Sequence, residues 1–236
     1  MKRKDSILRC VAQAVLVAAL VAAAGPAGAK TLLTVTSYDM PNGDGTAGGG
    51  DFNYWDQNYS NCVAGNCTVD GLAGSHLSGG TGKLTDGIVP TQSFFGGDGF
   101  GAYVGWLESP TITFHLGSLQ AISEVKLYVD NSPISGVSAP GPVIINGVSH
   151  SDPAWAGLSA PEMIDITGLA LIASDIVVTL DRTNFWVFLS EAKIFGPGPA
   201  ATPLPPAWPM MLAGLAGLGI FALRRRAVPA HAFAAA

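Results

Sequence analysis

Two cysteines in the first third of the chain, Cys62 and Cys67, are the side chains whose spacing most directly suggests chemistry. Only five positions separate them, so they can close a short disulfide loop in an oxidising compartment. A zinc site would need two further ligands of zinc type at suitable spacing, and the sequence provides none. We therefore predict a Cys62–Cys67 disulfide and keep a metal role as the less favoured alternative.

The sequence carries no recognisable catalytic motif. It has no H-E-x-x-H, no G-x-S-x-G, no Walker loop and no dinucleotide-binding fingerprint. The glycine-rich run 96–101 resembles a phosphate loop superficially, but strand-like sequence follows it, not the helix that would supply amide donors. His115 falls on the polar side of a predicted strand, and no Ser, Asp or Cys partner can be assigned to it. We therefore expect no enzymatic activity, with a hydrolase of unrecognised site as a remote alternative.

The charges are distributed unevenly, and their distribution argues against nucleic acid as a partner. Seven of the twelve basic residues lie near the termini. Between Lys30 and Thr202 there are five basic against sixteen acidic residues, a net formal charge of −11. Such a surface repels phosphate backbones.

Residues 1–29 have the three parts of a secretory signal peptide. A basic start (Lys2, Arg3, Lys4 and Arg9) precedes an apolar run over 11–24, which is too short to prefer a permanent membrane span. Small residues, Ala27 and Ala29, then stand at the −3 and −1 positions of a cleavage site. We predict a helical signal peptide that signal peptidase removes after Ala29.

Residues 30–196 are predicted to fold as an antiparallel β-sandwich. Apolar and polar residues alternate over 111–116 and again over 125–130, which is the period of a half-buried strand. Further short apolar runs follow over 143–148, 163–166, 176–180 and 186–195, separated by turn signals. Residues 30–37 predict an opening strand, and residues 38–82, rich in Gly, Asn, Asp and Ser, predict an ordered loop excursion. No amphipathic helix of three turns is present, so the fold class is all-β.

A linker, a short apolar segment and a basic stop close the sequence. Residues 197–206 are rich in Pro and Gly and predict a linker. Residues 207–223 carry no charge and predict a single transmembrane helix at the short end of the spanning range. We assign this helix and its basic stop to 207–226 and a short tail to 227–236. The basic stop, Arg224 to Arg226, would stay in the cytoplasm, and the sandwich would then lie outside it.

Several blocks of the central region resemble the discoidin, or coagulation-factor type C, family of galactose-binding-like jelly-roll domains. They are Leu84-Thr85-Asp86-Gly87, Tyr103-Val104-Gly105-Trp106, Pro110-Thr111-Ile112-Thr113-Phe114, and Trp186 with Leu189-Ser190-Glu191-Ala192-Lys193-Ile194-Phe195-Gly196. The resemblance also covers exported bacterial proteins that pair such a domain with a PEP-CTERM tail, and it then includes Ser37-Tyr38-Asp39-Met40. It implies a jelly-roll sandwich over residues 83–196.

The resemblance implies a structural calcium ion held by Asp86 and Glu191. Backbone carbonyls near Leu84, Val89 and Thr91 would complete an oxygen shell of the kind calcium prefers. The alternative is that Asp86 caps a turn and that Glu191 lies on a solvated strand face.

The resemblance further implies that sugars bind at loops on one end of the sandwich, where aromatic rings stack on them. Tyr54, Trp55, Tyr59 and Trp155 lie in predicted loops and are the candidate ligand-binding residues. Phe94 and Phe95 lie in such loops as well, whereas Trp106 and Trp186 belong to the shared blocks and are expected in the core.

The tail resembles the PEP-CTERM sorting signal, which a membrane exosortase processes in Gram-negative bacteria that make exopolysaccharide. The residues that carry the resemblance are Pro203, Pro205, Pro206, Arg224, Arg225 and Arg226. The Glu of the family's Pro-Glu-Pro is absent, and ten residues follow the arginines. The alternative is a simple C-terminal membrane anchor.

These expectations together predict an exported protein that is held at the inner membrane at least transiently and then reaches the cell surface or the extracellular matrix. Its partners would be signal peptidase, an exosortase-type enzyme and exopolysaccharide or envelope glycans. A structural or protein-interaction module without a glycan site is the alternative.

Overall fold

The computed structural model describes residues 29–44, 54–61, 75–132, 134–156 and 161–198, and the single positions 211, 214, 215 and 218. One compact unit spans Ala29–Pro199. The predictions for the leader, for Cys62 and Cys67, and for the prolines and arginines of the tail fall outside the described residues. They stay predictions.

The predicted membrane helix over 207–226 has only four described positions. Across the described part of the chain, no helix combines the length and the apolar character needed to cross a membrane.

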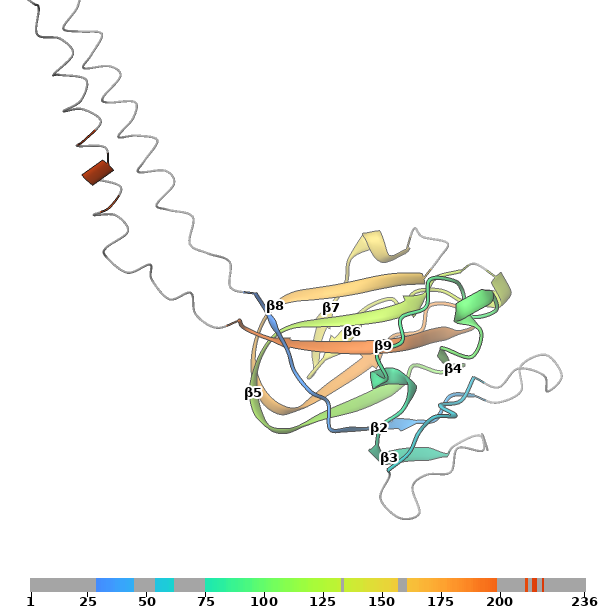
Figure 1. The fold of residues 1–236 in the computed structure, drawn as a ribbon. Coiled ribbons are helices and arrows are strands. Elements are labelled where there is room, and N and C mark those ends of the chain that lie inside the picture. Colours follow the sequence, from blue (N-terminus) through green and yellow to red (C-terminus); the bar gives the residue numbers. More distant parts are fainter. Residues whose placement is uncertain are drawn as a thin grey trace, which may run out of the picture. The chain divides into compact units, whose positions relative to one another are not determined.

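The described fold consists of nine strands and four short 3-10 helices (Figure 1). The strands are β1 (Thr31–Leu32), β2 (Ser37–Pro41), β3 (His76–Gly80), β4 (Val104–Trp106), β5 (Thr111–Asp130), β6 (Val143–Ile145), β7 (Val148–His150), β8 (Pro161–Leu180) and β9 (Val187–Gly196). The 3-10 helices are η1 (Lys83–Thr85), η2 (Gly97–Gly99), η3 (Ile134–Gly136) and η4 (Pro153–Ala156). Every pairing between the strands is antiparallel. The all-β class is confirmed.

The two long strands β5 and β8 each run through both layers of the sandwich. The first half of β5 pairs with β2 and with the last part of β8, which in turn pairs with β6. The second half of β5 pairs with the first part of β8 and with β9. The β5–β8 register shifts between His115 and Gln120, where both strands bend from one layer into the other (Figure 1). The antiparallel β-sandwich is therefore confirmed.

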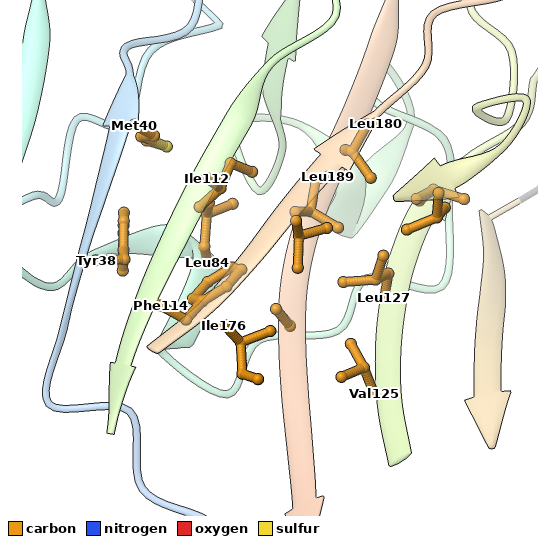
Figure 2. Packing of buried hydrophobic residues seen from close by; sticks show 14 of the residues in the cluster. Tyr38, Met40, Leu84, Ile112, Phe114, Val125, Leu127, Ile176, Leu180 and Leu189 are labelled. Atoms are coloured by element: carbon orange, nitrogen blue, oxygen red, sulfur yellow. The ribbon is translucent and has the colours of Figure 1, made fainter. Parts of the chain in front are cut away.

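The core lies between the two layers and follows the predicted alternation. Ile112 and Phe114 from one half of β5 and Val125 and Leu127 from the other are fully buried (Figure 2). Leu189 of β9 joins the same cluster. In β5 the period-two pattern predicted which face is inside, because successive side chains of a strand point to opposite faces.

Two details differ from the sequence expectations. The predicted opening strand over 30–37 is split, because β1 pairs with β9 in one layer whereas β2 pairs with β5 in the other. The segment predicted as loop over 38–82 contains most of β2 and all of β3, which pair with each other. Glycines at positions 79 and 80 obscured β3, because glycine is unfavourable in strand propensity.

Candidate functional site

A hollow of about 520 Å³ opens among loops that enter and leave the sandwich. We call it the aromatic pocket. It is lined by Tyr54, Phe94, Phe95, Leu107, Ile134, Ser135, Val137, Phe185, Trp186 and Phe188. These residues come from five separate segments of the chain, and β9, which supplies Phe188, is the only strand among them. A mostly apolar concave site of this size is typical of a small-ligand pocket.

The floor of the pocket is a cluster of packed aromatic rings. Phe94 and Phe188 stack with ring centroids 4.9 Å apart. Tyr54 meets the ring of Phe188 edge-on at 4.7 Å and that of Trp186 at 5.2 Å. Burial raises the pKa of Tyr54. Edge-to-face and offset pairs of this kind add to the stability given by burial alone.

The rim of the pocket leaves two phenylalanine rings open to solvent. Phe95 is 49% exposed and Phe185 is 65% exposed. The backbone at Phe185 is fixed from one side by Arg182, whose Nη1 donates to the carbonyls of Asn184 and Phe185. A Cβ atom at Gly136 would lie 2.7 Å from Cβ of Phe185, and the φ of Gly136 is +77°, so only glycine fits this close approach.

Asp130, the last residue of β5, holds the backbone at Phe94 on the floor of the aromatic pocket. Its buried carboxylate accepts hydrogen bonds from the backbone amides of Phe94, at 2.7 Å, and Ser132, at 2.8 Å. The sequence placed Asp130 on the polar face of its strand as the first residue of a turn. The structure shows that it joins two loops of the pocket.

The four predicted ligand-binding residues are not brought together. Tyr54 lines the aromatic pocket, and Trp55 beside it is partly buried. Tyr59 is in the core at 5% exposure; its hydroxyl donates to the carbonyl of Tyr38 and accepts from the amide of Gly80. Trp155 lines a different hollow of about 410 Å³, together with Asn131 and Asp152.

The sequence named three of the pocket's aromatic residues as loop residues, Tyr54, Phe94 and Phe95. It expected Trp186 in the core, and the structure confirms that Trp186 is buried. It missed Phe185, Ile134 and Leu107. The signal for Phe185 was weak, since an apolar residue after an Asp-Arg-Thr-Asn turn is as consistent with the start of a strand as with a loop.

Asp86 and Glu191, the predicted calcium ligands, interact electrostatically, although they are 105 positions apart in the sequence. Burial, with a contribution from Asp86, raises the pKa of Glu191 to about 7. Glu191 is 4% exposed, so it does not lie on a solvated face. Asp86 Oδ1 accepts a 2.8 Å hydrogen bond from the amide of Ile88, as expected of a turn cap. No cluster of three or more His, Cys, Asp or Glu side chains that could hold a metal occurs in the described residues.

The calcium site stays a prediction with a direct thermal test. A divalent cation would relieve the repulsion between the buried carboxylate of Glu191 and the exposed one of Asp86, with backbone carbonyls as further ligands. We expect a higher melting temperature in calcium than in chelator, and a smaller difference in a Glu191→Gln variant. An equal melting temperature in calcium and chelator would show that the pair binds no calcium.

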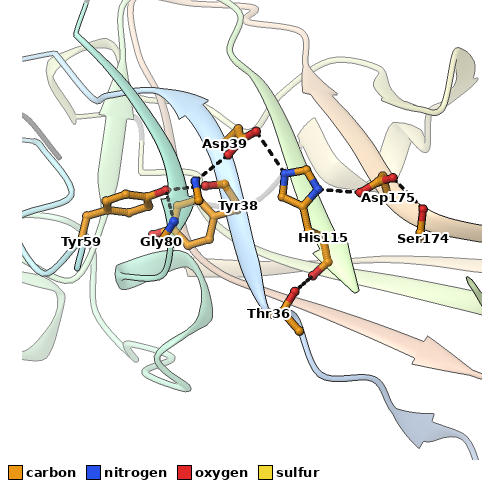
Figure 3. Close-up of polar contacts among 9 residues, drawn as sticks. Thr36, Tyr38, Asp39, Tyr59, Gly80, His115, Ser174 and Asp175 are labelled. Atoms are coloured by element: carbon orange, nitrogen blue, oxygen red, sulfur yellow. Dashed lines mark hydrogen bonds and ion pairs between the residues drawn. The ribbon is translucent and has the colours of Figure 1, made fainter. Parts of the chain in front are cut away.

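His115 joins three strands through a chain of polar contacts (Figure 3). Its Nδ1 lies 2.5 Å from Asp175 Oδ1 on β8, and its Nε2 lies 3.1 Å from Asp39 Oδ2 on β2. The hydroxyl of Ser174 donates to Oδ2 of Asp175, and the backbone amide of Gly79 donates to Oδ1 of Asp39. Both ring nitrogens face carboxylates, so the arrangement leaves no nitrogen to activate a nucleophile. We interpret His115 as a structural clamp.

The His115 clamp predicts that stability falls above neutral pH. Burial lowers the pKa of His115, but the hydrogen bonds to Asp175 and Asp39 outweigh it, and the pKa is raised overall. The charged histidine therefore contributes stability that is complete below its ordinary pKa of about 6.5 and is lost as pH rises through the raised value. Hydrogen bonds hold the pKa of Asp39 and Asp175 below their usual range, so their contribution is lost in acid.

Melting temperatures measured from pH 4 to 9 check this expectation against a His115→Gln variant. The difference between the two proteins should be largest between about pH 4 and 6.5 and shrink above. A difference that does not change with pH would mean that His115 acts only by packing.

Comparisons with known proteins identify likenesses of fold. No protein-family model matches the chain, and no curated protein matches it. A truncated AlyQ with CBM32 and alginate lyase domains is 18% identical, with a TM-score of 0.41, over 75% of this chain and 36% of that one. The lectin domain of Lectinolysin complexed with Lewis B antigen is 16% identical, with a TM-score of 0.35, over 47% of this chain and 79% of that one.

A third similar structure is the family 32 CBM of NanJ from C. perfringens in complex with galactose. It is 13% identical, with a TM-score of 0.28, over 39% of this chain and 75% of that one. At these identities no residue role transfers to this chain.

Proposed function

We propose that this chain is an exported, non-enzymatic protein that associates with polysaccharide through the aromatic pocket of its β-sandwich. The observation that carries the proposal is the pocket itself, a hollow at the loops with rings both on its floor and on its rim. Aromatic faces suit the apolar faces of sugar rings, and the few polar groups of such a site fix the orientation of the ligand.

The pocket is built on a rigid support, as a preorganised binding site requires. The floor rings pack against one another, and Asp130 and Arg182 fix the backbones at Phe94 and Phe185 through hydrogen bonds. The open rings of Phe95 and Phe185 therefore need little ordering when a ligand binds. A module of this kind has no need of catalytic groups, which agrees with the absence of catalytic motifs from the sequence.

Export and sorting are the second part of the proposal, and they rest on the sequence alone. The signal peptide over 1–29 and the PEP-CTERM-like tail would deliver the sandwich to the outer side of the inner membrane. Processing by an exosortase-type enzyme would then release it to the cell surface or matrix, where exopolysaccharide is the available ligand. A structural module without a glycan site is the competing function.

A glycan array probed with the full-length chain and with a Phe185→Ala variant tests the binding site. We expect retention on at least one class of polysaccharide and a loss of about tenfold or more in the variant, because a fully used aromatic contact is worth about 1.4 kcal/mol or more. Arrays that include Lewis-type sugars and galactose cover the ligands of two of the structures described above.

The matched control is Phe100→Ala. Phe100 is 65% exposed, as is Phe185, but it does not line the pocket. Equal losses in both variants would point to a non-specific effect of surface phenylalanines. Absence of retention on any glycan would favour the structural function instead.

A further inference from the structure

The side chains that line the aromatic pocket carry few hydrogen-bonding groups. Of the ten described residues around it, Ser135 alone has a small polar side chain, and Tyr54 and Trp186 carry one polar atom each. None is a carboxylate, an amide or a cation. A buried hydroxyl without a partner costs free energy, so a sugar that presents many hydroxyls to this lining is penalised.

The net negative charge of the domain disfavours acidic sugars as well. The span from residue 30 to 202 has a net formal charge of −11. The nearest cation in sequence to the rim, Arg182, donates from Nη1 to two backbone carbonyls. A uronate entering this pocket would meet a repulsive field and no free guanidinium or ammonium group among the lining residues.

The rim and floor offer instead a place for a methyl group. Phe95, Ile134 and Phe185 are exposed, whereas Phe94 and Phe188 close the floor. A methyl group that contacts these apolar side chains gains apolar burial, while the more polar edge of the sugar can remain in water at the open side.

We infer that the aromatic pocket selects neutral sugars that carry a methyl group over their hydroxylated or acidic counterparts. The methyl group is either C6 of a 6-deoxyhexose or that of an acetyl substituent. This inference rests on the proposed function, because it names the ligand class of the same pocket.

Calorimetric titration of the full-length chain with matched sugars tests it. One arm compares D-fucose, which has a methyl group at C6, with D-galactose, which differs from it only by the hydroxyl at C6. The second arm compares N-acetyl-D-glucosamine with D-glucose, and D-galacturonic acid serves as the acidic sugar. We expect the methyl-bearing member of at least one pair to bind about tenfold or more tightly, since each desolvated hydroxyl without a partner costs about one such factor. We expect the uronate to bind weakest.

Substitutions at the rim test whether the preference for methyl-bearing sugars arises in the aromatic pocket. Phe185→Ala and Phe95→Ala should lower the ratio of affinities within the preferred pair, whereas Phe100→Ala should leave it unchanged. Phe95→Leu keeps an apolar side chain and should retain most of the preference, and it serves if the alanine variants do not fold.

The outcomes separate the two proposals. Equal affinities within both pairs, or tighter binding of the uronate, would overturn the inference while glycan binding itself stands. A methyl preference that survives both rim variants would place it outside the pocket and also overturn the inference. Binding of no sugar in either arm or on the array would remove both proposals.

Discussion

Replacement of Asp56 by alanine is expected to lower the free energy of unfolding by about 3–5 kcal/mol. Asp56 is fully buried, and its carboxylate accepts the hydroxyl of Tyr38 and the backbone amide of Lys83, the latter at 3.0 Å. The alanine variant leaves both buried donors without a partner. Chemical denaturation at neutral pH measures the change.

The Asp56 contact matters because it ties three separate parts of the fold together. Tyr38 belongs to β2, Asp56 to the loop that follows, and Lys83 to η1. The ammonium of Lys83 also donates to the carbonyl of Trp55 at 2.7 Å, which fixes the loop beside Tyr54 of the aromatic pocket. We therefore expect the Asp56→Ala variant to weaken ligand binding in addition to stability.

Two variants control the interpretation of Asp56. Tyr38→Phe removes one donor and leaves the amide of Lys83 bonded to Asp56. It should therefore lower the free energy of unfolding by about 1–3 kcal/mol. Asp98 also accepts three hydrogen bonds, from the amide and hydroxyl of Thr91 and the amide of Gln92, but it is exposed. Asp98→Ala should cost clearly less, because water replaces the lost acceptor. Equal costs for Asp56→Ala and Asp98→Ala would contradict a special role of burial.

Replacement of Phe188 by alanine should have an effect of similar size, about 3–5 kcal/mol, because the change leaves a cavity in a packed aromatic cluster. Phe188 is fully buried, and its ring contacts those of Tyr54, Phe94, Tyr103 and Trp186. The variant also removes the floor of the aromatic pocket. Denaturation and glycan retention, measured on the same preparation, should therefore both decline.

Gly105 provides a sharp test of this packing. A Cβ atom at Gly105 would lie 2.4 Å from the ring of Phe188, so Gly105→Ala should be destabilising by itself. In the Phe188→Ala background the added methyl enters the space that the ring has left, and its cost should shrink or change sign. Strict additivity of the two changes would show that they do not share this contact.

The strands were readable from the sequence where one face is buried and the other is not. In β5 the alternation of Ile112 and Phe114 with threonines identified the inward face correctly. One of the turn signals between the predicted strands, Thr167-Gly168, was misleading, because β8 continues through Gly168, whose φ is +74°. A glycine at positive φ bends a strand as well as ending one, and only the pairing of β8 with β5 decides between the two.

The aromatic pocket was predictable in part, and the limit has a geometric cause. Loop aromatics such as Tyr54 and Phe95 stand out in sequence because they interrupt Gly- and Asn-rich segments. Whether two such residues share a surface depends on which strand ends are neighbours, and the pairing of distant strands decides this. Tyr54 and Trp186 are 132 positions apart, yet their rings are 5.2 Å apart. Tyr59, five positions from Tyr54, is turned into the core.

The sequence by itself determined the all-β class, the inward faces of the strands and the acidic character of the domain, because these follow from local periodicity and composition. The tertiary structure decided which loops meet, that Asp56 and Asp130 are buried acceptors, and that His115 lies between Asp39 and Asp175. Such relations depend on the register and bending of β5 and β8, which set residues far apart in the chain side by side. The local periodicity of a strand shows which of its faces is buried, but it does not show with which distant residues the strand aligns.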